Sequence, residues 1–214
     1  MKTGTSFTDS SGGVTIETGN GMSGSAGDIL FKVGESKAGV GGSVQMQAGS
    51  SLSSTGGSID LIGGGSAAGA SGSVTIASNT GLNSGAISIQ TSSAQEGHSG
   101  NIEMRTGQAA SGSSGRLILE SGESLNGAGG DVSIRGGASS SPLGGGSVTI
   151  DAGKSLEGST GVGGSVIMRA GSSATQTGGR LFLQSGLSKN AQGGNIDIQS
   201  GSGGSSSGSI DLRT

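Results

Sequence analysis

Two large apolar residues, separated by one residue of variable character, recur fourteen times along this 214-residue chain. Residues 145–153, Gly-Gly-Ser-Val-Thr-Ile-Asp-Ala-Gly, show the pattern: Val148 and Ile150 are followed at Ala152 by a small residue. Alternation with a period of two is typical of a strand with one face buried. We call the five residues that start at the first large apolar residue an apolar segment, and the residues between two such segments a connector.

The apolar segments recur with a nearly constant step. They begin at Val14, Ile29, Val44, Ile59, Val74, Ile87, Ile102, Leu117, Val132, Val148, Val166, Leu181, Ile196 and Ile210. The usual step is fifteen residues, with a short one before Ile87 and long ones before Val148 and Val166. Self-similarity at a fixed period predicts a repeat architecture.

Glycine stands two residues before every apolar segment, and we call this residue the corner glycine. The corner glycines are Gly12, Gly27, Gly42, Gly57, Gly72, Gly85, Gly100, Gly115, Gly130, Gly146, Gly164, Gly179, Gly194 and Gly208. Such constancy indicates a backbone requirement, either a positive φ or a close approach of chain to chain. The exit residue, directly after a segment, is glycine except at Asn79 and Ser92. Because asparagine tolerates the left-handed region, we expect a second corner there.

A strand, a corner, a second extended stretch and a corner back fit a repeat of about fifteen residues. The sequence therefore predicts an all-β fold, a thin two-sided parallel β-solenoid (β-helix) of about fourteen coils. Residues 1–11, which lack an apolar pair, are expected to form an N-terminal lead-in or cap, and residues 12–214 the solenoid domain. Since the chain stops directly after an apolar segment, we expect a segment of a longer array, or ends that meet other molecules.

Composition narrows the classes of function. Fifty glycines, three phenylalanines and no tryptophan, tyrosine or cysteine leave little bulk for a globular core. A disordered Gly/Ser tract would give the apolar residues no reason to keep register with the glycines. A net charge of −3 without stacking aromatics argues against nucleic acid as a partner, and no apolar run is long enough to insert into a membrane.

Three short motifs resemble nucleotide or catalytic loops. Residues 19–24 fit the dinucleotide pattern without a following helix, residues 153–155 end like a phosphate loop that lacks its first glycine, and residues 204–208 fit a nucleophile elbow in a serine-rich corner. His98 is the only histidine, so no histidine cluster can form in one chain. We therefore predict a protein that is not an enzyme, with no cofactor and no metal site.

One charge pattern stands out at the position after the second large apolar residue. Successive copies have Arg105, Glu120, Arg135, Asp151 and Arg169 there. In a stacked solenoid these side chains would lie one above another with alternating sign, which stabilises the stack and disfavours slippage. We interpret them as a structural charge ladder; a stripe that binds mineral or polysaccharide is the alternative.

Ice binding is the alternative function. Ice binders usually present ranked threonines on one flat face, whereas the position between the two large apolar residues varies from Thr15 to Leu30 and Asp60. The third connector residue is always small, and a wall of such residues could lie flat against the strand. Examples are Ser36, Ser51, Ala109, Ser155 and Ser188.

The phrase Gly-Gly-Ser-Val-x-Ile-x-Ala-Gly resembles the Gly/Ser-rich repeats of large predicted cell-surface and adhesive proteins of microalgae such as diatoms. More distantly, it is similar to repeats of filamentous bacterial adhesins. The resemblance covers residues 11–214 and implies a parallel β-solenoid in a secreted chain, located outside the cell or at its surface. The expected function is a structural or adhesive module, a rigid rod that attaches to polysaccharide or mineral surfaces or to neighbouring copies end to end. The matching positions are scaffold positions, so no functional residue is carried over.

Overall fold

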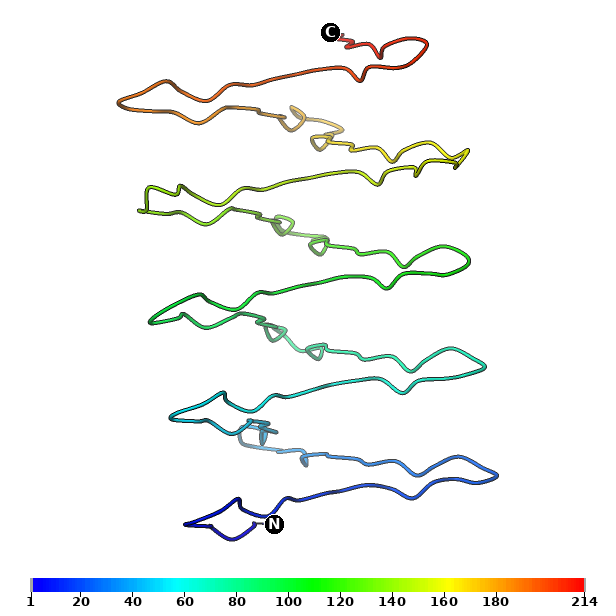
Figure 1. Ribbon diagram of the computed structural model, residues 1–214, viewed down its shortest axis with the longest axis vertical. Helices are drawn as coiled ribbons and strands as arrows, with labels where there is room; N and C mark the ends of the chain where they lie inside the picture. Colours follow the sequence, from blue (N-terminus) through cyan, green and yellow to red (C-terminus); the bar gives the residue numbers. More distant parts are fainter. Residues whose placement is uncertain (1, 214) are drawn as a thin grey trace. The chain divides into compact units, whose positions relative to one another are not determined.

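The computed structural model describes residues 2–213 and places neither a helix nor a strand among them. Figure 1 shows the apolar segments as extended stretches that alternate with loops. No backbone hydrogen bond within the described residues joins one apolar segment to another. The predicted parallel β-solenoid is therefore wrong, because the ladder of hydrogen bonds between stacked strands is not formed.

The surface area shows how little the chain buries. Its accessible surface is 21482 Å². A compact protein of 20.1 kDa would expose about 8,700 Å², and the unfolded chain about 29,000 Å². The chain thus buries about a quarter of its surface, against about 70% for a compact chain of this length. Two large apolar residues in every fifteen supply too little bulk to close a core within one copy.

The large side chains on the apolar face of the segments are only partly exposed, but none of them is buried. Val44 and Ile59 are 61% and 52% exposed, whereas Leu52, in the connector between them, is fully exposed. The segment side chains are therefore only partly shielded from solvent. None of residues 2–213 is buried.

Most connectors fold back on themselves as closed loops. In seven of them the N–H of the corner glycine donates a hydrogen bond of 2.8 to 2.9 Å to the carbonyl of the exit glycine. The donor and acceptor pairs are Gly57 and Gly49, Gly72 and Gly64, Gly146 and Gly137, Gly164 and Gly153, Gly179 and Gly171, Gly194 and Gly186, and Gly208 and Gly201. In two further connectors the hydroxyls of Thr18 and Ser121 donate to the carbonyls of the corner glycines Gly27 and Gly130, at 3.1 and 2.7 Å. The two ends of these loops therefore lie side by side.

Close approach explains the corner glycine. A Cβ added to Gly179 would lie 3.2 Å from the nitrogen of Gly171 and 3.6 Å from the Cβ of Ala170. At Gly164 the corresponding distances, to Gly153 and Ala152, are 3.2 and 3.4 Å. Since a side chain there would push the two loop ends apart, the prediction of a close approach is confirmed.

Positive φ angles occur elsewhere. Among the described residues they are found at Gly97, Gly112, Gly144 and Gly158, none of which is a corner glycine or an exit residue. The alternative that corner glycines adopt a positive φ is therefore wrong, as is the left-handed second corner expected at the exit residue. These four glycines lie within connectors, where the loop must reverse direction.

The small residue at the end of a segment is explained by the same close approach of the two loop ends that explains the corner glycine. Ala48, Ala152, Ser185 and Ser200 are among the few half-buried residues of the chain. A Cβ on the corner glycine Gly57 would meet the Cβ of Ala48 at 3.5 Å. A large side chain at this position would therefore prevent the loop from closing.

The two long connectors absorb their extra residues in β-turns. The N–H of Gly144 donates to the carbonyl of Ser141 across Pro142, and the N–H of Ser159 donates to the carbonyl of Leu156, both at 3.1 Å. Serine, proline and glycine at the first, second and fourth positions suit a type I turn, and Gly158 supplies the positive φ of a type II turn. Both connectors still close with the bond between corner and exit glycine.

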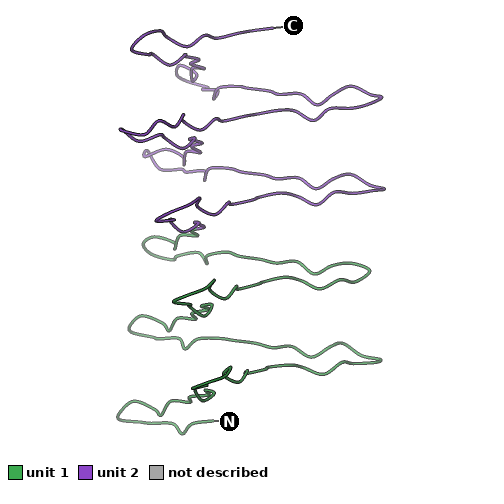
Figure 2. Cartoon of the chain, turned by 90° about the vertical axis from the view of Figure 1, so that its right-hand side faces the viewer, with its two compact units in different colours: residues 1–103 green, residues 104–214 purple. Residues whose placement is uncertain are grey.

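The chain divides into two units, Met1–Glu103 and Met104–Thr214 (Figure 2). The division falls inside the apolar segment that starts at Ile102, and each unit contains closed loops of the same kind. The expected boundary between residues 1–11 and 12–214 stays a prediction. Residues 2–213 contain no helix that could cross a membrane.

Adding one methyl group tests the closed loop. We expect Gly179→Ala to break the bond to the Gly171 carbonyl, because the new Cβ would lie against that residue. Loss of a bond worth about 1 kcal/mol should accelerate hydrogen exchange of the residue 179 amide roughly fivefold, after correction for intrinsic rates. The matched control is Gly171→Ala, whose Cβ would meet nothing within 4 Å. Equal exchange in the two variants would contradict the close-approach explanation.

Candidate functional site

A serine near the start of the connector organises the loop from within. In six connectors the hydroxyl oxygen of the third residue accepts a hydrogen bond of 2.9 to 3.0 Å from the N–H three residues later. The acceptor serines are Ser36, Ser51, Ser66, Ser124, Ser173 and Ser188. A side-chain oxygen that replaces a backbone acceptor in this way stabilises a turn that would otherwise be held only by water.

This role was missed by the sequence analysis, which assigned the small third residue to a wall against the strand. Of the residues named there, Ser36, Ser51 and Ser188 accept the turn bond. Ser155 instead donates to the hydroxyl of Ser159 at 3.2 Å, and Ala109 has no hydroxyl. The available signal was the frequency of serine at a position where alanine or glycine would be equally small.

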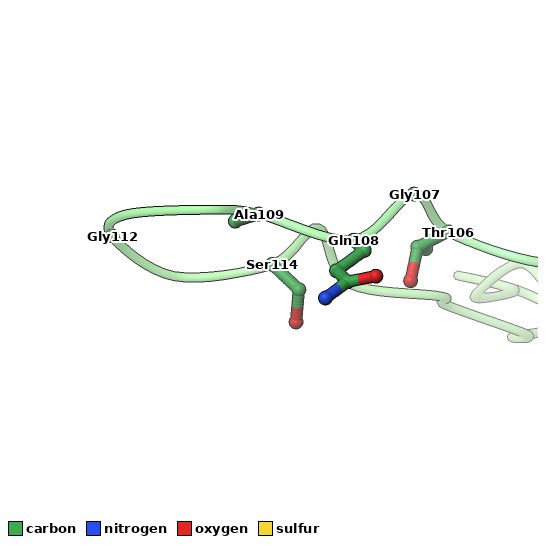
Figure 3. A pocket seen from close by; sticks show the side chains of 6 residues that line it. All are labelled: Thr106, Gly107, Gln108, Ala109, Gly112 and Ser114. Carbon is green, nitrogen blue, oxygen red and sulfur yellow. The ribbon is translucent and has the colours of Figure 1, made fainter.

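The loop after the seventh apolar segment forms a polar concavity of about 470 Å³. Its lining residues are Thr106, Gly107, Gln108, Ala109, Gly112 and Ser114. Figure 3 shows the side chains of Thr106, Gln108 and Ser114 on the same side of the loop. Gly112, with a φ of 94°, lies where the loop turns back.

The chemistry of this concavity is neutral and polar. Two hydroxyls and one amide supply donors and acceptors of hydrogen bonds without a formal charge. All three side chains are exposed, so water competes with any ligand. The arrangement suits weak, reversible hydrogen bonding to a hydroxyl-rich surface, and it offers no nucleophile paired with a base.

The five residues of the predicted charge ladder lie in five successive apolar segments. Within the described residues, no ion pair joins any two of Glu120, Arg135, Asp151 and Arg169. An ion pair that the structure does contain is local: the Arg213 guanidinium lies 3.2 Å from an Asp211 carboxylate oxygen. The role of the five residues as a ladder stays a prediction.

The remaining sequence candidates lie in connectors. Residues 19–24, 153–155 and 204–208 are followed by further loop or extended chain, without the helix that a phosphate loop or nucleophile elbow requires. His98 is exposed beside Gly97, one of the glycines with a positive φ. Across residues 2–213 no three potential metal-binding side chains come together.

Comparison with protein families, with curated sequences and with solved structures found no match to this chain. The resemblance to microalgal surface repeats therefore stays a prediction.

The serine turn is tested by removing one hydroxyl. We expect Ser173→Ala to accelerate hydrogen exchange of the Gln176 amide by roughly three- to tenfold, because that N–H loses its acceptor at 2.9 Å. Ser172→Ala is the matched control, since this neighbouring hydroxyl makes no such bond. Exchange at Gln176 that responds equally to both substitutions would show that the turn does not depend on the serine oxygen.

Proposed function

We propose that the chain is an extracellular structural or adhesive repeat module whose connector loops attach it to polysaccharide. The observation that supports this proposal best is the recurrence of one loop design, with a serine turn in six connectors and exposed hydroxyls throughout. A loop design that recurs along the chain presents the same weak site many times.

Repetition compensates for the weakness of each site. A hydrogen bond formed in competition with water contributes only about 0.5 to 1.5 kcal/mol. When one loop is held at a surface, the next loops are confined close to it, and their effective concentration raises the total affinity. The short connectors keep neighbouring loops about fifteen residues apart, so that several can bind at once.

Polysaccharide fits the loops better than mineral. The exposed serine hydroxyls of the connectors are neutral donors and acceptors, which match sugar hydroxyls. The concavity formed by Thr106, Gln108 and Ser114 is equally neutral, although its connector lacks the serine turn. A mineral surface would be expected to select charged side chains, yet Asp, Glu, Lys and Arg make up only 12% of the chain. We therefore regard neutral polysaccharide as the first surface to test.

The test uses the full chain and removes the six turn-forming hydroxyls together. In the turn variant, serines 36, 51, 66, 124, 173 and 188 are replaced by alanine. In the control variant, six connector serines that make no turn bond, residues 23, 50, 113, 140, 172 and 202, are replaced instead. We expect the turn variant to bind cellulose particles at least about tenfold more weakly than the natural chain, with the control little changed.

Two outcomes would contradict the proposal. Equal weakening of both variants would mean that hydroxyl number matters and loop order does not. Absence of binding by the natural chain to cellulose, to chitin and to a neutral soluble glucan would remove polysaccharide as the surface.

Ice binding is tested separately by thermal hysteresis and crystal shape in the presence of the natural chain. We expect no hysteresis, because Leu30, Asp60 and Ile118 occupy positions where an ice binder would present threonines. Clear hysteresis with faceted crystals would place ice binding ahead of polysaccharide attachment.

A further inference from the structure

The apolar segments are the largest unexplained feature of the molecule. Between Leu117 and Ile150, the second large residue of each segment is about two-thirds exposed: Leu119 67%, Ile134 68% and Ile150 66%. Exposed apolar residues that recur at regular positions indicate a contact surface for another molecule.

The exposed area is more than sufficient for a stable association. The chain exposes roughly 13,000 Å² more than a compact protein of its mass would, whereas a standard protein interface buries about 1,200 to 2,000 Å². The backbone of the segments adds a second reason. Among the described residues, no hydrogen bond joins the backbone of one segment to the backbone of another. A neighbouring extended chain could therefore pair with the N–H and C=O groups of a segment.

We propose that the occupant of this surface is a second copy of the same chain, aligned side by side and displaced by one repeat. Each apolar segment then pairs with the next segment of the other copy and places its large residues on a common face. This arrangement differs from end-to-end contact between neighbouring copies, and it does not depend on attachment to polysaccharide.

The charged residues after the second large apolar residue favour a displacement of one repeat over alignment without displacement. If two copies were aligned in parallel without displacement, each of Arg105, Glu120 and Arg135 would face its own counterpart, and like charges opposite each other are destabilising. A displacement of one repeat makes four pairs of opposite charge, in which Arg105 faces Glu120, Glu120 faces Arg135, Arg135 faces Asp151 and Asp151 faces Arg169. The signs at these positions are therefore complementary to the same chain shifted by one repeat.

Closed loops keep this register over connectors of unequal length. The steps from Arg135 to Asp151 and from Asp151 to Arg169 are longer than fifteen residues. The bonds between Gly146 and Gly137 and between Gly164 and Gly153, both 2.9 Å, nevertheless bring the ends of these two connectors together. The extra residues extend the loops and leave the distance between the ends of successive segments unchanged.

The charges are tested with two complementary variants of the full chain, studied by sedimentation velocity over a range of concentrations. Arg105→Glu, Arg135→Glu and Arg169→Glu make all five positions acidic, and Glu120→Arg with Asp151→Arg makes all five basic. At low salt we expect each variant alone to associate at least about tenfold more weakly than the natural chain. An equimolar mixture should restore association, because four of the five positions in each copy then face an opposite charge in the displaced register.

A control variant distinguishes the effect of where the charges lie from the effect of net charge on association. Lys37→Glu, Lys154→Glu and Lys189→Glu, all in connectors, change the net charge from −3 to −9, as the acidic variant does, because each replacement contributes −2. We expect this control to associate like the natural chain. A control as weak as the acidic variant, a mixture that does not associate, or a natural chain that stays monomeric at all concentrations would overturn the proposal.

The displacement has its own readout. The chain contains no cysteine, so thiols introduced by Ser133→Cys in one preparation and Thr149→Cys in another are the only ones present. These positions are equivalent in consecutive segments. On mixing and mild oxidation we expect the crosslink between the two preparations to exceed the crosslink of Ser133→Cys with itself. The opposite order would overturn the displacement by one repeat.

Discussion

The hydrogen bond between corner and exit glycine is the constraint on which the rest of the structure depends. It brings two backbones to within 2.8 to 2.9 Å of N···O contact, and this is possible only where neither side carries bulk. The constraint therefore explains two separate regularities of the sequence: glycine before each segment and, in nearly every copy, a small residue at its end. It does not explain the glycine after the segment, because a Cβ added to an exit glycine such as Gly171 would meet nothing within 4 Å. It also makes each of the seven connectors that it closes a local unit held together by its own two ends.

Sequence reasoning located these regularities but misjudged what they serve. Alternation in segments such as residues 148–152 shows that one face is apolar, but it does not reveal what covers that face. A solenoid was the simplest structure that would cover it, yet within residues 2–213 no backbone hydrogen bond joins two segments and most of the surface is exposed. Corner glycines admitted two explanations, and the close contacts of Gly164 and Gly179 with the exit glycines decide for close approach. The serine turns could not be predicted from size alone, because Ser124 and Ala109 occupy equivalent small-residue positions and only one has an oxygen that accepts a bond.

Two chemically distinct surfaces thus alternate along one chain. The loops present neutral hydroxyls and amides that hydrogen-bond weakly, whereas the segments present exposed aliphatic side chains on an extended backbone. Interactions of the first kind suit a hydrated partner, and interactions of the second kind suit another extended polypeptide. Because the two surfaces occupy different residues, the proposed attachment and the proposed pairing of copies do not compete for the same groups.

The bond at the base of each loop also has a consequence for how such a sequence can change. Residues 137–146 and 153–164 already show that a connector can gain length while its ends stay in contact. The entropic cost of lengthening a flexible loop grows only with the logarithm of its length. Insertions at the loop tips should therefore accumulate with little effect on the segments, and foreign peptides grafted there would be displayed at spacings that the segments determine.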